Sequence, residues 1–171
     1  MNEILTWEDL NKYEIEDLDR VNGSNNSYAN SQGYRDELPE LKRLTDLSIG
    51  IRRINKGLKF EAKGKYKKAN KMYNEAIDFL LKANKRQNID SDIFFYLGFA
   101  YNKLKDLDNA EIYYTLGLTI DPTNIYINRN LGMLYLDSKR INLAKERLKS
   151  LENCNCEQYL DLKNFVLNYK F

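Results

Sequence analysis

The feature that most constrains the fold is the spacing of apolar residues over 91–124. Its first half carries apolar side chains at intervals of three and four residues: Phe94, Leu97, Tyr101 and Leu104. A second run with the same spacing follows the polar pair Lys105-Asp106: Leu107, Ala110, Tyr114 and Leu118. Residues three and four apart share one face of an α-helix. Two such stripes joined by a short polar break predict an antiparallel helical hairpin.

The ends and the middle of this hairpin also carry signals. Ser91 or Asp92 can cap the first helix by accepting a backbone N–H. Pro122 cannot continue a helix, so the second helix is expected to end before it. Gly98 and Ala110 are small, which allows the two helices to approach closely where they meet.

The pattern recurs along the chain. A later unit, displaced by 34 residues, has apolar and small residues at the same places: Leu131, Gly132, Tyr135, Ala144 and Leu148. An earlier unit carries Gly57, Phe60, Ala69, Tyr73 and Ala76. The step from Ala69 to Ala110 is 41 residues, and the surplus predicts a second helix extended by about two turns through Leu80 and Ala83. One hairpin cannot bury its own apolar face, so neighbouring hairpins must stack.

Residues 91–124 resemble a tetratricopeptide repeat, whose signature is W-x2-L-G-x2-Y, then A-x3-F, then P. In this sequence the signature places are held by Phe94, Leu97, Gly98, Tyr101, Ala110, Tyr114 and Pro122. The resemblance implies an all-α solenoid of about three hairpins. We expect the array to span 37–156, with repeats at about 50–90, 91–124 and 125–156, and a capping helix at 157–171.

Residues 1–36 precede the array. Residues 1–21 form a partial amphipathic stripe with the only tryptophan, Trp7, and 22–36 are rich in Gly, Ser and Asn, which predicts an acidic arm followed by a linker. Leu38-Pro39 is expected to start the first helix. No apolar run approaches the length of a membrane span, and the N-terminus does not resemble a secretory signal. The sequence therefore favours a soluble protein of the cytoplasm or an organelle over a secreted one.

The resemblance implies a concave groove lined by the first helix of each repeat, which would bind a segment of another protein. Among the residues at the lining places, which also include Glu61, we expect the partner to contact Ile54, Leu58, Phe95, Phe99, Asn102, Lys103, Tyr126, Arg129 and Met133. An apolar, aromatic lining favours an amphipathic helix or an extended apolar peptide. The alternative is that several of these side chains belong to the core between repeats.

One subtype of the family binds acidic C-terminal tails through a clamp of Lys and Asn side chains. In this sequence the clamp places hold Ile54, Leu58, Tyr96, Tyr126 and Asn130. Only Asn130 retains the required chemistry. We therefore expect no tight binding of an acidic C-terminal tail.

Charge is distributed unevenly. Residues 1–41 hold ten acidic and three basic residues, and 42–90 hold fourteen basic and five acidic ones. The candidate basic patch comprises Arg52, Arg53, Lys56, Lys59, Lys63, Lys67 and Lys68. Three interpretations remain open: a solvated helix face, a surface covered by the chain's own acidic arm, or a contact for an acidic protein or RNA. The last gives an alternative function, a structural subunit of a larger assembly or ribonucleoprotein.

Enzyme chemistry is not indicated. The chain has no histidine, no glycine-rich phosphate loop and no nucleophile elbow. Cys154 and Cys156 form a Cys-x-Cys pair, but with no His or further Cys one chain cannot complete a four-ligand Cys/His zinc site. We interpret them as small residues at a helix end, with a redox or inter-chain role as the alternative. The sequence thus predicts a non-catalytic adaptor without metal or cofactor, and it does not indicate an oligomeric state.

Overall fold

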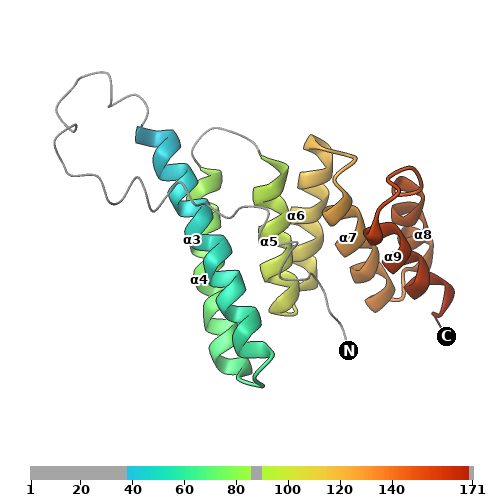
Figure 1. The fold of residues 1–171 in the computed structure, drawn as a ribbon, viewed down its shortest axis with the longest axis horizontal. Coiled ribbons are helices and arrows are strands. Elements are labelled where there is room, and N and C mark those ends of the chain that lie inside the picture. Colours follow the sequence, from blue (N-terminus) through green and yellow to red (C-terminus); the bar gives the residue numbers. More distant parts are fainter. Residues whose placement is uncertain (1–37, 86–89, 170–171) are drawn as a thin grey trace.

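The computed structural model describes residues 38–85 and 90–169 (Figure 1). The predicted N-terminal arm and linker lie outside these residues. Helices make up all the regular structure of the described part, which contains no strand: α3 (Leu38–Glu61), α4 (Tyr66–Asn84), α5 (Ser91–Lys103), α6 (Leu107–Ile120), α7 (Ile125–Asp137), α8 (Ile141–Ser150) and α9 (Glu157–Leu167). The all-α prediction is confirmed.

The helices pair as consecutive hairpins, α3 with α4, α5 with α6 and α7 with α8, which follow one another along the long axis of the molecule (Figure 1). The helix α9 packs on α7 and α8 at the C-terminal end, as the predicted capping helix should. One core cluster of buried side chains runs from Ile51 to Leu162 through all the hairpins. The molecule is therefore an α-solenoid with a continuous core.

The turns inside the hairpins are built alike. Gly64, Lys105 and Lys139 have φ values of 66°, 64° and 60°, which lie in the left-handed region. They are separated by 41 and 34 residues, the same steps that separate the apolar stripes. Glycine adopts this conformation freely, and the two lysines adopt it at some cost. The shared turn fixes how each second helix folds back on its first.

Close packing within a hairpin depends on a glycine that faces an aromatic ring sixteen residues later. A Cβ on Gly57 would lie 2.5 Å from the ring of Tyr73, and a Cβ on Gly98 would lie 2.5 Å from the ring of Tyr114. Both tyrosines are about 1% exposed or less. The predicted close approach is confirmed at Gly98, although the group that fills the space is Tyr114.

Two local predictions need comment. The cap of α5 is Asp90, whose Oδ1 accepts the N–H of Asp92 at 2.9 Å, so placing the cap at Ser91 or Asp92 was wrong by one or two residues. The extension of the first repeat is confirmed in α4, which runs to Asn84 and has 19 residues against 14 in α6.

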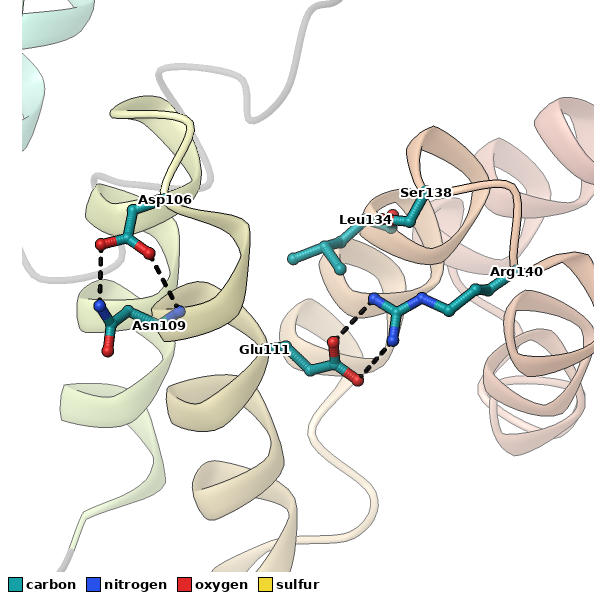
Figure 2. Close-up of polar contacts among 6 residues, drawn as sticks. All are labelled: Asp106, Asn109, Glu111, Leu134, Ser138 and Arg140. Atoms are coloured by element: carbon teal, nitrogen blue, oxygen red, sulfur yellow. Dashed lines mark hydrogen bonds and ion pairs between the residues drawn. The ribbon is translucent and has the colours of Figure 1, made fainter.

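Polar contacts also tie one hairpin to the next (Figure 2). The guanidinium of Arg140, which precedes α8, donates to both carboxylate oxygens of Glu111 on α6, at 2.9 and 2.7 Å. The pKa of Arg140 is raised, chiefly by this hydrogen bond to Glu111. Nearby, Asp106 caps α6 by accepting the backbone N–H of Asn109. The ion pair between Arg140 and Glu111 is partly exposed, so it contributes little to stability and mainly orients the two hairpins.

We predict that Gly98→Ala destabilises the fold. The added methyl group would overlap the Tyr114 ring, which is fully buried and cannot swing into solvent. Overpacking costs about 1–3 kcal/mol, and the better helix propensity of alanine offsets only about 1 kcal/mol of that. Thermal or urea unfolding measures the loss. The matched control is Asn70→Ala at an exposed position of α4, which should leave stability unchanged or slightly higher. Equal stability of the two variants would contradict the tight Gly98–Tyr114 contact.

Candidate functional site

We call the nine predicted partner-binding residues on α3, α5 and α7 the first-helix face. Its aromatic members meet across the junction between the second and third hairpins. The ring of Phe95 lies 6.2 Å from that of Phe99 and 5.8 Å from that of Tyr126 on α7. The structure therefore brings the aromatic residues of neighbouring first helices into contact, as the repeat register requires.

Much of this face is buried. Five of its members are 9% exposed or less: Ile54, Phe95, Phe99, Arg129 and Met133. The other four are half-buried: Leu58, Asn102, Lys103 and Tyr126. Every residue of α5 from Ile93 to Ala100, and of α7 from Ile127 to Leu136, is buried. A helical turn takes 3.6 residues, so these stretches are covered on all sides. Side chains available at the surface are thus limited to the half-buried four.

The edge of the face between the first and second hairpins carries a polar network. Glu61 on α3 accepts a hydrogen bond from the Tyr73 hydroxyl at 2.5 Å and forms an ion pair with Lys103 at 3.2 Å. Burial, and then the hydrogen bond to the Glu61 carboxylate, raise the pKa of Tyr73. The network connects α3, α4 and α5. Its acidic member, Glu61, stands at a lining place of the first repeat, and the repeat pattern does not indicate that it pairs with a lysine 42 residues away.

Arg129 is held by the capping helix. Its Nε donates to Oδ2 of Asp161 on α9 at 2.8 Å, and its Nη2 donates to the same oxygen. Arg129 was predicted as a partner-binding residue of the groove, and in the folded chain an internal carboxylate takes up two of its N–H groups. No repeat signature includes Asp161, since α9 lies beyond the last repeat.

The Tyr114 hydroxyl stands out chemically. The side chain is 0% exposed, and no group among the described residues makes a hydrogen bond of good geometry with its oxygen. Burial raises the pKa of Tyr114, while the positive charge of Arg129 and the side-chain amide of Asn102 act in the opposite direction. A buried hydroxyl without a partner lowers the stability of the fold. The repeat signature accepts phenylalanine at this place, so the sequence pattern does not reveal the cost.

The predicted basic patch lies on the first hairpin. Six of its seven members are exposed on α3, on α4 or in the turn between them: Arg52, Lys56, Lys59, Lys63, Lys67 and Lys68. The seventh, Arg53, is half-buried and forms an ion pair with Glu75 at 3.1 Å. The predicted cations thus lie on one hairpin. Arg53 differs from the other six because it is paired with Glu75.

The two cysteines are joined. Cys154 and Cys156 form a disulfide in the connection between α8 and α9, with Cα atoms 5.1 Å apart. Cys156 is also the N-cap residue of α9. The interpretation of these cysteines as two small residues at a helix end was right about their position, but it did not predict the disulfide.

Among residues 38–85 and 90–169, the acidic and cysteine side chains form no cluster suited to a metal ion. Within the same residues no helix combines the length and hydropathy needed to cross a bilayer.

The two buried tyrosines give opposite predictions. Tyr73→Phe should lower the free energy of unfolding by about 1–3 kcal/mol, because it removes a hydrogen bond to a charged carboxylate. Tyr114→Phe should leave stability unchanged or raise it by about 1 kcal/mol, because it removes a buried hydroxyl that has no partner. The two variants lose the same atom at equivalent places of adjacent repeats, so each is the control for the other in urea unfolding. Equal losses would contradict the assigned hydrogen bonding.

Comparison with known proteins agrees with this architecture. Residues 91–124 match the family model of the tetratricopeptide repeat. The TPR domain of Arabidopsis OM64 superposes with a TM-score of 0.54 at 17% identity, covering 73% of this chain and 99% of that domain. The second TPR domain of human RPAP3, solved with an HSP70 peptide, gives a TM-score of 0.56 at 16% identity, with 76% and 98% covered.

At such low identity the two structures establish the fold alone. No curated protein sequence matches the chain. The matched repeat lies between hairpins built on the same turn and the same glycine places, and the whole shares the fold of known TPR domains. The described residues therefore have the fold of a TPR domain, with a match to the tetratricopeptide repeat at residues 91–124.

Proposed function

We propose that the chain is a non-catalytic adaptor that binds a helical or extended apolar segment of another protein through the first-helix face. The observation that carries the proposal is that the partly exposed ring of Tyr126 packs on the buried ring of Phe95, which in turn packs on Phe99, so an aromatic surface is held in place across two neighbouring first helices. The second TPR domain of human RPAP3, which has a similar fold, was solved in complex with an HSP70 peptide. That similarity supports peptide binding by this fold.

The half-buried members of the face define the contact. Leu58 and Tyr126 offer apolar surface on α3 and α7, and Asn102 offers an amide between them on α5. The ammonium of Lys103 lies 5.7 Å from the Phe99 ring centre and pairs with Glu61. In this proposal an apolar side chain of the partner packs on Tyr126, while Asn102 bonds to the partner's backbone. The buried residues beneath them hold these side chains in place.

The chemistry of the partner is narrowed by the clamp places. Ile54 and Tyr96 are buried apolar or aromatic side chains, and the Asn130 amide donates to the Tyr126 carbonyl at 2.8 Å. None of them presents a cation to a carboxylate. The proposed partner segment is therefore apolar, and it does not depend on an acidic C-terminus.

We predict that a peptide ending in a free Glu-Glu-Val-Asp carboxylate does not bind tightly to the chain. The reason is that the clamp places lack the lysines that would neutralise two carboxylates. Fluorescence anisotropy with the labelled peptide measures binding, and the amidated peptide is the control. Micromolar affinity that disappears on amidation would contradict the prediction.

For the apolar segment, we predict that random-peptide display against the full chain enriches sequences with apolar residues at helical or alternating spacing. The triple variant Asn102→Ala/Lys103→Ala/Tyr126→Ala should weaken these peptides by tenfold or more, since aromatic and hydrogen-bonding anchors dominate such contacts. Isothermal titration measures the affinity of each peptide.

The matched control is Ile112→Ala/Leu116→Ala/Lys149→Ala, which truncates exposed side chains on the second helices α6 and α8. This control should bind the enriched peptides as the unaltered chain does. Failure to enrich any peptide, or equal losses in the two triple variants, would reject the proposed face.

A further inference from the structure

We call the side of α3 that carries Arg52, Lys56 and Lys59 its outer face. The residues at these places differ in character from those at the equivalent places of α5 and α7. In α5 and α7 the residues at these places are apolar and at most 2% exposed: Ile93, Leu97, Ala100, Ile127, Leu131 and Leu134. The places 41 residues before those of α5 hold Arg52, Lys56 and Lys59, all exposed. Among the described helices, α3 is the first of the array. A charged outer face suits such a terminal repeat, because it leaves no apolar surface for another repeat to cover.

Solubility alone does not require one sign of charge. Residues 52–71 contain nine basic side chains and one acidic side chain, Glu61. Glu61 is engaged by Tyr73 and Lys103, so it does not offset the charge of Arg52, Lys56 or Lys63. Within the described residues, no carboxylate forms an ion pair with Arg52, Lys56 or Lys63. A mixture of acidic and basic side chains would keep a terminal face equally soluble. The outer face of α3 is instead cationic.

The cations form a line. Arg52, Lys56 and Lys59 follow one another at intervals of four and three residues, which places them on one side of α3, and Lys63 follows four residues later in the turn. With a rise of 1.5 Å per residue the part of the line that lies on α3 is about 10 Å long. The opposite side of α3 carries Ile51, Ile54 and Gly57, which face the core. The line is therefore a continuous positive surface, long enough for several consecutive phosphates.

The turn that carries Lys63 leads to an exposed aromatic ring at the start of α4. Tyr66, the first residue of α4, is 65% exposed and stands between Lys65 and Lys67. The helices of this hairpin have 24 and 19 residues, against 13 and 14 in the next, and the turn that joins them extends beyond the rest of the solenoid (Figure 1). The ring is thus open to a planar ligand on the part of the molecule that projects farthest.

We propose that the outer face of α3 and the turn before α4 form a binding site for single-stranded nucleic acid. Phosphates contact Arg52, Lys56 and Lys63, and a base stacks on the Tyr66 ring. Single strands are bound in general by such a combination of a cationic track and aromatic stacking platforms. An acidic protein segment would use the lysines but gain little from Tyr66. The site goes beyond the proposed adaptor function, and it uses none of the first-helix residues.

The test is fluorescence anisotropy of the full chain with a labelled single-stranded oligouridylate of roughly 15 nucleotides, titrated over a range of salt concentrations. The variant Arg52→Gln/Lys56→Gln/Lys63→Gln should reduce the slope of log K against log salt by about 2, since each phosphate contact on a single strand contributes about 0.7. Tyr66→Ala should weaken binding about tenfold, as loss of one stacked base does, and Tyr66→Phe should bind as the unaltered chain.

The matched control is Lys105→Gln/Lys145→Gln/Lys149→Gln, which removes the same charge from exposed positions on the other hairpins. It should keep the salt slope close to that of the unaltered chain. No binding, equal slope changes in both triple variants, or a Tyr66→Ala affinity equal to that of the unaltered chain would overturn the proposal. Tight binding of polyglutamate with none of the oligouridylate would also overturn it, in favour of an acidic protein. An oligodeoxythymidylate distinguishes DNA from RNA, and circular dichroism confirms that each variant folds.

Discussion

The contact on which the solenoid depends is that between a glycine on the first helix of a hairpin and a tyrosine sixteen residues later on the second. At Gly57 and Gly98 the missing Cβ leaves room for the face of a ring, and the ring fills it. The helices then approach closely enough for their apolar stripes to close into one core. The interval of sixteen residues leaves room for one turn between the helices. Gly64 and Lys105, whose φ values lie in the left-handed region, form that turn. The glycine–tyrosine contact and the turn therefore depend on each other.

The third hairpin shows what happens when half of this contact is missing. Gly132 occupies the glycine place, and the residue sixteen positions later is Leu148, which is smaller than tyrosine and only half-buried. The space over Gly132 is filled by Leu162 of α9, whose Cδ2 would lie 2.6 Å from an added Cβ. The same helix supplies Asp161 to the buried Arg129. The capping helix therefore completes the last hairpin with an apolar side chain and a carboxylate.

The architecture could be predicted from the sequence because it depends on short-range rules. Helix stripes, the proline after α6 and the recurrence of glycine and tyrosine places all act within one hairpin, and the hairpin repeats. Prediction was weaker where the decisive partner lies outside the repeat. Nothing at Gly132 indicates that Leu162 would cover it. The cap of α5 was misplaced because Asp90, Ser91 and Asp92 are all good capping residues, and backbone geometry selects among them.

The candidate site was harder to predict, for a related reason. A place in the repeat gives the side of the helix on which a residue lies, and burial depends on what covers that side. Phe99 occupies a lining place and is 0% exposed, whereas Tyr126 occupies another and remains half-buried. On the outer face of α3 the sequence was more informative. Arg52 and Lys56 stand at the places that hold Ile93 and Leu97 in the next repeat, which shows that the first repeat departs from the apolar pattern of the others. A charge at a place that is apolar in every other repeat has no role in the core. Its function, whether solubility or binding, is therefore to be found at the surface.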